Sequence, residues 1–269
     1  MPAAQRTRAG HFLLVAVVVV LGLLVAAVGG AGLHRLTASS TSPPKVPVTT
    51  TTVVVVPGEV SSAQQILDAH ASDAVVQVTT QRCEGFGNGS GVLVGPDLVV
   101  TAAHVIFDGS VFFVSTRTAA MRPAQVVVYA PELDLAVLRV PGLPSVATPV
   151  LADDLRSNSG SVLNRTTTGV EAHPFAVAKR EVATVPRVGS AVAGDRSVIV
   201  MAVRLAPGDS GGPLIDEEGR LAGIAFGVDR GDKSIGYASP AASVRTVLSR
   251  VGAPTGFVPP TCGIKLAPG

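Results

Sequence analysis

The pattern of apolar and polar positions divides the chain into three stretches. Residues 12–31 form one uncharged apolar run, residues 37–57 are rich in Thr, Ser and Pro, and from Val75 onward short apolar runs alternate with polar residues and turn formers. The first stretch is typical of a membrane segment, the second of a linker and the third of a globular region built from strands. These patterns predict the division 1–11, 12–33, 34–60 and 61–269.

Twelve short apolar runs in the globular region are separated by Gly, Pro, Asp or Asn, which is typical of strands joined by turns. Six runs precede residues 141–158 and six follow them, so the pattern predicts two similar β units packed together. The first six are Val75–Thr79, Gly91–Val94, Leu98–Thr101, Val111–Ser115, Gln125–Tyr129 and Leu135–Val140. The second six are Ser161–Leu163, Glu181–Val185, Ser197–Val203, Pro213–Ile215, Leu221–Phe226 and Ile235–Ala238.

Helical signals occur at both ends of the globular region. Ser61 followed by Gln64 is typical of a capped helix start. A second helix is predicted from Pro240 to Val251, with proline at its start and Gly252 after its end. The fold class predicted from these patterns is all-β, with a C-terminal helix after the strands.

Residues 12–33 are long enough to cross a bilayer, since about twenty helical residues span roughly 30 Å. Arg6 and Arg8 precede the segment, which places residues 1–11 in the cytoplasm and the globular region on the extracytoplasmic side, periplasmic or extracellular. The alternative is a secretory signal peptide cleaved near the small residues at 27–31. We favour a single-pass anchor in the cell membrane because the apolar run exceeds the usual length of a signal-peptide core.

Composition narrows the classes of function. The formal net charge is only +2, so the chain shows no electrostatic footprint for nucleic acid. The sequence contains no metal-ligand cluster, phosphate-binding loop or cofactor motif, and neither a metal nor a cofactor is expected. Residues 34–60 cannot bury enough apolar surface to offset the entropy of ordering them, so they are predicted to form an extended tether.

A glycine-rich motif is the first candidate for chemistry. Residues Gly208–Pro213 read Gly-Asp-Ser-Gly-Gly-Pro and lie between two predicted strands. A serine hydroxyl becomes a nucleophile when a base removes its proton, and the transition state needs N–H donors for its oxyanion. Gly208 allows a backbone turn in which the N–H groups of Gly208 and Ser210 converge. An ordinary glycine-rich turn is the alternative, which six consecutive motif positions disfavour.

His104 is the candidate base for Ser210. It follows a β-branched run and two alanines, which leave room for the imidazole to stand over a cleft. His70 is expected to be a surface or capping residue, His173 to be a loop residue and His34 to flank the membrane segment.

Asp134 is the candidate for the carboxylate that fixes the tautomer of such a base. It opens the apolar run 135–140, where the sheet would hold its backbone and bury its side chain. Asp97 and Asp108 are alternatives, but each lies in a predicted turn.

The three motifs resemble those of the chymotrypsin/trypsin-like serine proteases. Thr101–His104 is similar to the histidine motif of that superfamily, Asp134–Leu138 to its aspartate motif and Gly208–Pro213 to its serine motif, in the same order. The resemblance covers about residues 72–250. It implies two six-stranded antiparallel β-barrels, with the three motif side chains in the cleft between them as a catalytic triad and with an oxyanion hole from the N–H groups of Gly208 and Ser210.

A second resemblance is to the periplasmic protease domain of actinobacterial membrane-bound acid-resistance serine proteases. The shared features are the run Gly208–Asp216 and two cysteines, Cys83 ahead of the first glycine-rich strand and Cys262 in the tail. Here one hydrophobic segment precedes the domain, where that family has several. Two cysteines of an exported domain are expected to pair; two free thiols are the alternative.

The resemblance to serine proteases also implies a substrate pocket beside the nucleophile, walled by residues 224–227 and 235–238. The candidate lining residues are Arg204, Phe226, Gly227, Gly236 and Tyr237. The two aromatic side chains favour a shallow or apolar pocket. Because Arg204 could point outward from its strand, no acidic preference is inferred. Residues 235–238 also resemble a segment of HtrA-type proteases.

The function predicted from the sequence is that of a serine endopeptidase anchored through residues 12–33. It would act on protein or peptide substrates of the cell envelope by an acyl-enzyme route. A catalytically silent binding or sensor domain and a non-peptide esterase are the alternatives.

Overall fold

The structure, a computed structural model, describes residues 61–153 and 158–262. The predicted membrane segment 12–33 and linker 34–60 lie outside the described residues. Within the described ranges, no helix has the length and apolar character needed to cross a bilayer.

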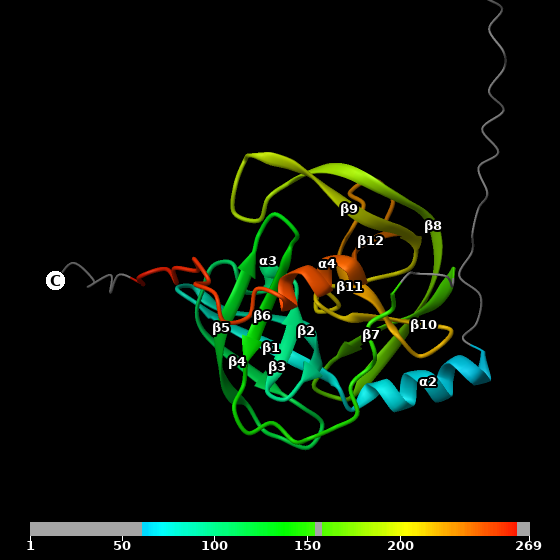
Figure 1. Cartoon of the computed structure of the whole chain (residues 1–269), viewed down its shortest axis with the longest axis horizontal. Coiled ribbons are helices and arrows are strands. Elements are labelled where there is room, and N and C mark those ends of the chain that lie inside the picture. The colour runs from blue at the N-terminus through cyan, green and yellow to red at the C-terminus, as the bar shows by residue number, and fades with distance from the viewer. Residues whose placement is uncertain (1–60, 154–157, 263–269) are drawn as a thin grey trace, which may run out of the picture. The chain divides into compact units, whose positions relative to one another are not determined.

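The first six strands form a closed antiparallel barrel in the order β1-β2-β3-β6-β5-β4 (Figure 1). Alternate side chains of these strands point inward, as the period of two predicts, and fill the barrel with Val, Leu and Ala. The strands are β1 (Val75–Arg82), β2 (Gly85–Gly95), β3 (Leu98–Thr101), β4 (Gly109–Ser115), β5 (Arg122–Ala130) and β6 (Leu135–Arg139).

The second six strands form another closed antiparallel barrel, in the order β10-β11-β12-β9-β8-β7. Its core is a separate cluster that includes Phe175, Ile199 and Met201. The strands are β7 (Ser159–Arg165), β8 (Val170–Pro186), β9 (Ala193–Ala202), β10 (Pro213–Asp216), β11 (Leu221–Val228) and β12 (Ile235–Pro240). The all-β prediction with two units of six antiparallel strands is therefore confirmed.

The end of the β8–β9 hairpin projects beyond the second barrel. Residues 177–186 of β8 pair with β9, whereas residues 170–176 pair with β7. The projecting part, residues 177–198, is called the ribbon below. Its tip reaches the first barrel, where the Val188 N–H donates to the Pro131 carbonyl at 3.1 Å and Gly189 lies directly against the Phe107 ring. In Figure 1 the ribbon bends over α3 at the top of the first barrel.

Three helices accompany the strands in the described ranges. The helix α2 (Ser62–Ser72) is capped by Ser61, whose side chain accepts the N–H of Gln64 as the sequence predicts. The helix α4 (Ala241–Leu248) follows the last strand and ends earlier than predicted. The one-turn helix α3 (Ala103–Ile106) was not predicted, because four residues are too short for a helical period to be recognised.

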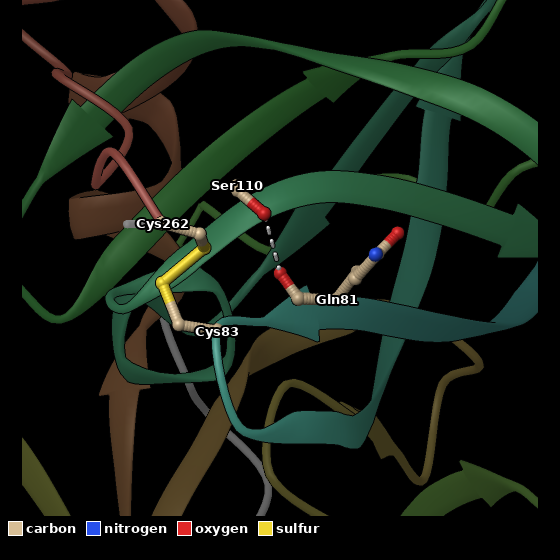
Figure 2. Close-up of a disulfide and its surroundings, with 4 residues drawn as sticks. All are labelled: Gln81, Cys83, Ser110 and Cys262. Carbon is tan, nitrogen blue, oxygen red and sulfur yellow. Dashed lines mark hydrogen bonds between the residues drawn. A yellow bond between two sulfur atoms is a disulfide. The ribbon is translucent and has the colours of Figure 1, made fainter. Parts of the chain in front are cut away.

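A disulfide joins Cys83, in the β1–β2 turn, to Cys262, in the segment after α4. Figure 2 shows this bond beside the hydrogen bond from the Ser110 hydroxyl to the Gln81 carbonyl, which ties β4 to β1. The disulfide therefore fastens the C-terminal segment to the first barrel, and the predicted pairing is confirmed.

Candidate active site

His104 and Asp134 come together in the structure. The Nδ1 atom of His104 lies 3.1 Å from both carboxylate oxygens of Asp134, and the backbone N–H of His104 donates to Oδ1 at 3.0 Å. An ionised carboxylate only accepts hydrogen bonds, so Nδ1 must carry the proton and Nε2 is left with a free lone pair. The contact therefore leaves Nε2, on the other side of the ring, able to accept a proton as a base.

The turn that carries Asp134 is held in an uncommon conformation. Asp134 has φ +52°, in the left-handed region that aspartate tolerates better than most residues. The preceding residue, Leu133, donates its N–H to Ala130 and accepts the Ser239 hydroxyl from β12 at 2.8 Å. Both barrels thus contribute to the position of the carboxylate, whose side chain is only 7% exposed.

Burial near Asp134 also affects a neighbouring phenol. The pKa of Tyr129 is raised to about 12, first because the ring is removed from water and second because the Asp134 charge opposes formation of tyrosinate. Tyr129 therefore stays a neutral phenol well above neutral pH.

The loop Gly208–Pro213 is shaped by two glycines at positive φ, Gly208 at +108° and Gly211 at +87°. Its other N–H groups are used: Asp209 donates to Ala206, and Gly211 donates to Ala225 on β11 at 2.8 Å. Among the described residues no acceptor faces the N–H of Gly208 or that of Ser210. These two donors are free for a ligand oxygen, as an oxyanion hole requires.

Ser90, on β2 of the first barrel, binds this loop through two hydrogen bonds. The backbone N–H of Ser90 donates to the Ser210 carbonyl at 2.8 Å, and its hydroxyl donates to the Gly208 carbonyl at 2.8 Å. Close approach continues at Gly211, where a Cβ atom would lie 2.1 Å from the Ser90 carbonyl and 3.1 Å from the Ala102 nitrogen. The Ser210 loop consequently lies against the segment that leads into His104.

The Ser210 hydroxyl itself makes no hydrogen bond to another residue in 61–153 or 158–262. Contacts between a nucleophile and its base are commonly long in the absence of substrate and tighten when substrate binds. The structure thus brings His104 and Asp134 into direct contact and Ser210 onto the adjoining loop.

Asp209 is buried beneath the loop and faces a histidine. Its Oδ2 accepts the Ala206 N–H at 2.7 Å and lies 3.5 Å from Nε2 of His173. Burial is the main cause that raises the pKa of Asp209, while the Ala206 hydrogen bond and the His173 charge oppose this and Glu171 adds to it. The prediction that His173 belongs to a loop is wrong, because this residue lies in β8 opposite Val162.

Arg196 is a buried arginine near Asp134 that the sequence patterns do not single out. The guanidinium of Arg196, on β9, lies 4.2 Å from the centre of the Phe226 ring. Its Nη2 lies 3.9 Å from Oδ2 of Asp134. The strand predicted from the sequence begins at Ser197, one residue after Arg196. The prediction therefore left Arg196 out of the alternation of buried and exposed side chains that places it inside.

The predicted pocket residues fall into two groups. Phe226 and Tyr237 are stacked, with ring centres 6.1 Å apart, and Gly236 is buried where a Cβ would meet Val203. Arg204, by contrast, is exposed. Of the predicted lining residues, Phe226 and Tyr237 therefore contact each other.

The other histidine and aspartate candidates lie elsewhere. His70 is exposed in the last turn of α2, as predicted. Asp108 pairs with Arg82, and Asp97 accepts the N–H of Gly142, so neither contacts His104. In the described ranges no group of three or more His, Cys, Asp or Glu could hold a metal ion.

Residues 89–224 match the family of trypsin-like peptidase domains, and the chain belongs to this family. Two curated relatives, the serine proteases MT3772 and Rv3671c from two strains of Mycobacterium tuberculosis, are each 31% identical to the chain over 179 residues. The match covers 64% of this chain but only 44% of those relatives, which is less than half of their length.

Solved structures agree with this assignment. The active form of the Rv3671c protease from M. tuberculosis is 28% identical, with a TM-score of 0.68 over 77% of this chain and 92% of that one. The HtrA-type protease AlgW with a tripeptide gives a TM-score of 0.59 at 23% identity, over 69% of this chain and 62% of that one, which is a likeness of fold. The predicted resemblance to trypsin-like serine proteases is confirmed.

Proposed function

We propose that the chain is a serine endopeptidase in which His104, Asp134 and Ser210 form the catalytic triad. The observation that carries this proposal is the contact of Nδ1 of His104 with both Asp134 oxygens, because it leaves Nε2 as a base beside the Ser210 loop. The family to which residues 89–224 belong supports the same activity.

The reaction follows from these positions. Nε2 of His104 takes the proton of the Ser210 hydroxyl as Oγ attacks the peptide carbonyl, and the developing oxyanion accepts the N–H groups of Gly208 and Ser210. His104 then gives the proton to the departing amine, and an ester between the substrate acyl group and Ser210 remains. Water, deprotonated by the same imidazole, hydrolyses this ester and restores the serine.

A fluorophosphonate probe tests the proposal on the domain that begins at Ser61. The wild type is expected to take up one probe per molecule and to cleave a peptide library, and Ser210→Ala is expected to do neither while keeping its fold. Because the domain contains a disulfide, labelling is measured under both oxidising and reducing conditions. A wild type that labels in neither condition would exclude the endopeptidase and favour a catalytically silent binding or sensor domain.

Cleavage assays separate the endopeptidase from an esterase. Hydrolysis of simple esters without cleavage of any peptide in the library would contradict the proposed substrate class. Cleavage between internal residues of a peptide, abolished by Ser210→Ala, would support it.

Residues 12–33 anchor the proposed enzyme in the cell membrane, with the peptidase domain on the extracytoplasmic side and proteins of the cell envelope as substrates. The uncharged length of residues 12–31 and the preceding Arg6 and Arg8 support this location. Cell fractionation, with added protease reaching the domain only from outside, tests the location. Sequencing the mature N-terminus distinguishes an intact anchor from a cleaved signal peptide.

A further inference from the structure

Arg196 is a charged residue in a position that the strand pattern reserves for apolar side chains. Along β9 the exposed Asp195 and Ser197 alternate with the buried Arg196 and Val198. Only 4% of the Arg196 side chain is exposed. An arginine is rarely buried to this extent unless its charge has a partner, so a partner for the Arg196 guanidinium is expected inside the protein.

Those surroundings come from both barrels. Phe226 of β11 lies beneath the guanidinium at 4.2 Å, and Oδ2 of Asp134, in the turn before β6, lies 3.9 Å from Nη2. Burial lowers the pKa of Arg196, and the negative charge of Asp134 opposes that shift. The Nε and Nη1 atoms make no hydrogen bond among the described residues, so Asp134 is the anionic partner of this guanidinium there.

We propose that Arg196 is a positioning residue of the catalytic site, whose guanidinium shares the Asp134 carboxylate with His104. In this role Arg196 offsets part of the attraction between the Asp134 carboxylate and the imidazolium that forms on His104 during the reaction. The inference rests on the proposed function, because it assigns a role within the same triad.

The division of the carboxylate explains how Arg196 acts. Nδ1 of His104 lies 3.1 Å from both oxygens; Oδ1 also accepts the His104 backbone N–H, and Oδ2 also lies 3.9 Å from Nη2 of Arg196. The negative charge of Asp134 stabilises an imidazolium, and a second cation on the same carboxylate offsets part of that stabilisation. Removing the charge of Arg196 should therefore let Asp134 stabilise the imidazolium more strongly, which favours the protonated form of His104 in the neutral variants.

The other groups around the carboxylate do not supply this cation. Tyr129 of β5 faces Asp134 as a neutral phenol, and Phe226 contributes only its ring face to Arg196. Stacking on that ring holds the guanidinium plane in place, and a lysine would keep the positive charge near the carboxylate without the planar contact. Charge and orientation are thus separable by substitution at one position.

The test is the pH dependence of the fluorophosphonate labelling rate of the domain, measured per competent site from the final extent of labelling. Arg196→Met and Arg196→Gln remove the charge, and Arg196→Lys keeps it. The matched control is Arg250→Met, because Arg250 is an exposed arginine that pairs with Glu132, two residues before Asp134, at 2.7 Å. Because the labelling rate is expressed per site that can be labelled, its pH profile does not depend on the fraction of each variant that folds.

We expect the acidic limb of the profile to move to higher pH by about half a unit to one unit in the Met and Gln variants. The limb is expected to stay close to that of the wild type in Arg196→Lys and in Arg250→Met. An unchanged limb in the neutral variants would overturn the role of Arg196, as would an equal displacement in Arg196→Lys. Failure of the wild type to label would instead overturn the proposed function, so the two failures are distinguishable.

Discussion

The hydroxyl of Ser90 donates a hydrogen bond to the Gly208 carbonyl at 2.8 Å and thereby links the first barrel to the loop that carries Ser210. The same hydroxyl accepts the Arg165 N–H at 3.0 Å, and the Ser90 backbone N–H donates to the Ser210 carbonyl. One fully buried side chain thus satisfies a backbone acceptor and a backbone donor of the second barrel. The loop conformation that leaves the N–H groups of Gly208 and Ser210 free therefore depends on the hydrogen bonds that Ser90 makes to the loop.

Replacing Ser90 by alanine should weaken both the fold and the site. The change leaves the Gly208 carbonyl and the Arg165 N–H without their buried partner, which costs about 1–3 kcal/mol. We expect a lower urea midpoint and slower fluorophosphonate labelling per folded molecule. Ser110→Ala is the control, since that exposed hydroxyl bonds to Gln81 far from the loop; equal effects of the two changes would contradict the role of Ser90.

Gly208→Ala tests the oxyanion donors without crowding the site. A Cβ at this position would meet no atom within 4 Å, but the φ of +108° is strained for alanine. Relaxation of the loop should misplace the N–H groups and lower kcat by about 10²-fold, with a loss of stability no larger than that of a strained glycine elsewhere. Gly85→Ala is the matched control, because Gly85 also has positive φ, at +126°, and open space, but lies at the start of β2. A kcat of the Gly208 variant equal to that of the control would argue against an oxyanion hole here.

Asp134→Asn separates the charge of this residue from its backbone conformation. Asparagine also tolerates the left-handed region, so φ +52° is expected to persist, but the fold is expected to lose stability because the buried Arg196 loses its anionic partner. The amide can donate to Nδ1 and favours the wrong imidazole tautomer, so kcat should fall by about 10⁴-fold. Steady-state hydrolysis with thermal unfolding as the stability check measures both effects. Activity within ten-fold of the wild type would exclude Asp134 as the residue that orients His104.

Loss of the disulfide should destabilise the domain without changing its chemistry. The bond closes a loop with a sequence separation of 179, for which the chain-entropy model gives about 5 kcal/mol. Urea unfolding of Cys83→Ser/Cys262→Ser, and of the wild type with dithiothreitol, should show the same lower midpoint. Dithiothreitol should leave the double variant unchanged, and a further shift there would point to a different cause.

The buried Asp209 should make stability fall as the pH rises. Because its pKa is raised from the ordinary 3.8, the folded chain keeps this proton at pH values where the unfolded chain has released it. Folding free energy is therefore lost as the pH rises from about 4 through the raised pKa. Asp209→Asn, which has no proton to release, should gain stability relative to the wild type over that range.

Urea midpoints of the wild type and Asp209→Asn between pH 4 and 8 measure this difference. Asp68, whose pKa is also raised by burial, contributes equally to both proteins and cancels in the comparison. Parallel curves for the two proteins would contradict the assignment of the effect to Asp209.

The strands were predictable because their apolar runs are short and are punctuated by turn residues. All twelve occur in the structure, but β8 begins at Val170 where the sequence indicated Glu181. Most of its side chains are exposed or only half-buried, so no apolar alternation marks its first half. Local pattern thus located each strand whose inward face is apolar and failed where the strand lies at the surface.

The site was predictable to the extent that its residues lie in contiguous motifs. His104 and Asp134, which the motifs singled out, contact each other in the structure. Ser90 and Arg196 carry no motif, because each acts across the boundary between the barrels and only the fold brings it to its partner. The pairing of His173 with Asp209 was not predicted for the same reason, because His173 lies in β8 and Asp209 in the loop before β10.

The ribbon has a consequence for self-association. Along residues 177–186 the outer edge of β8 pairs with no other strand of the described ranges, so its backbone groups could template pairing with a second copy. Charged side chains at Lys179, Arg180 and Glu181 and a proline at 186 occupy this edge, and such residues discourage strand addition between molecules. Pairing between the ribbons of two copies into a shared sheet is therefore disfavoured.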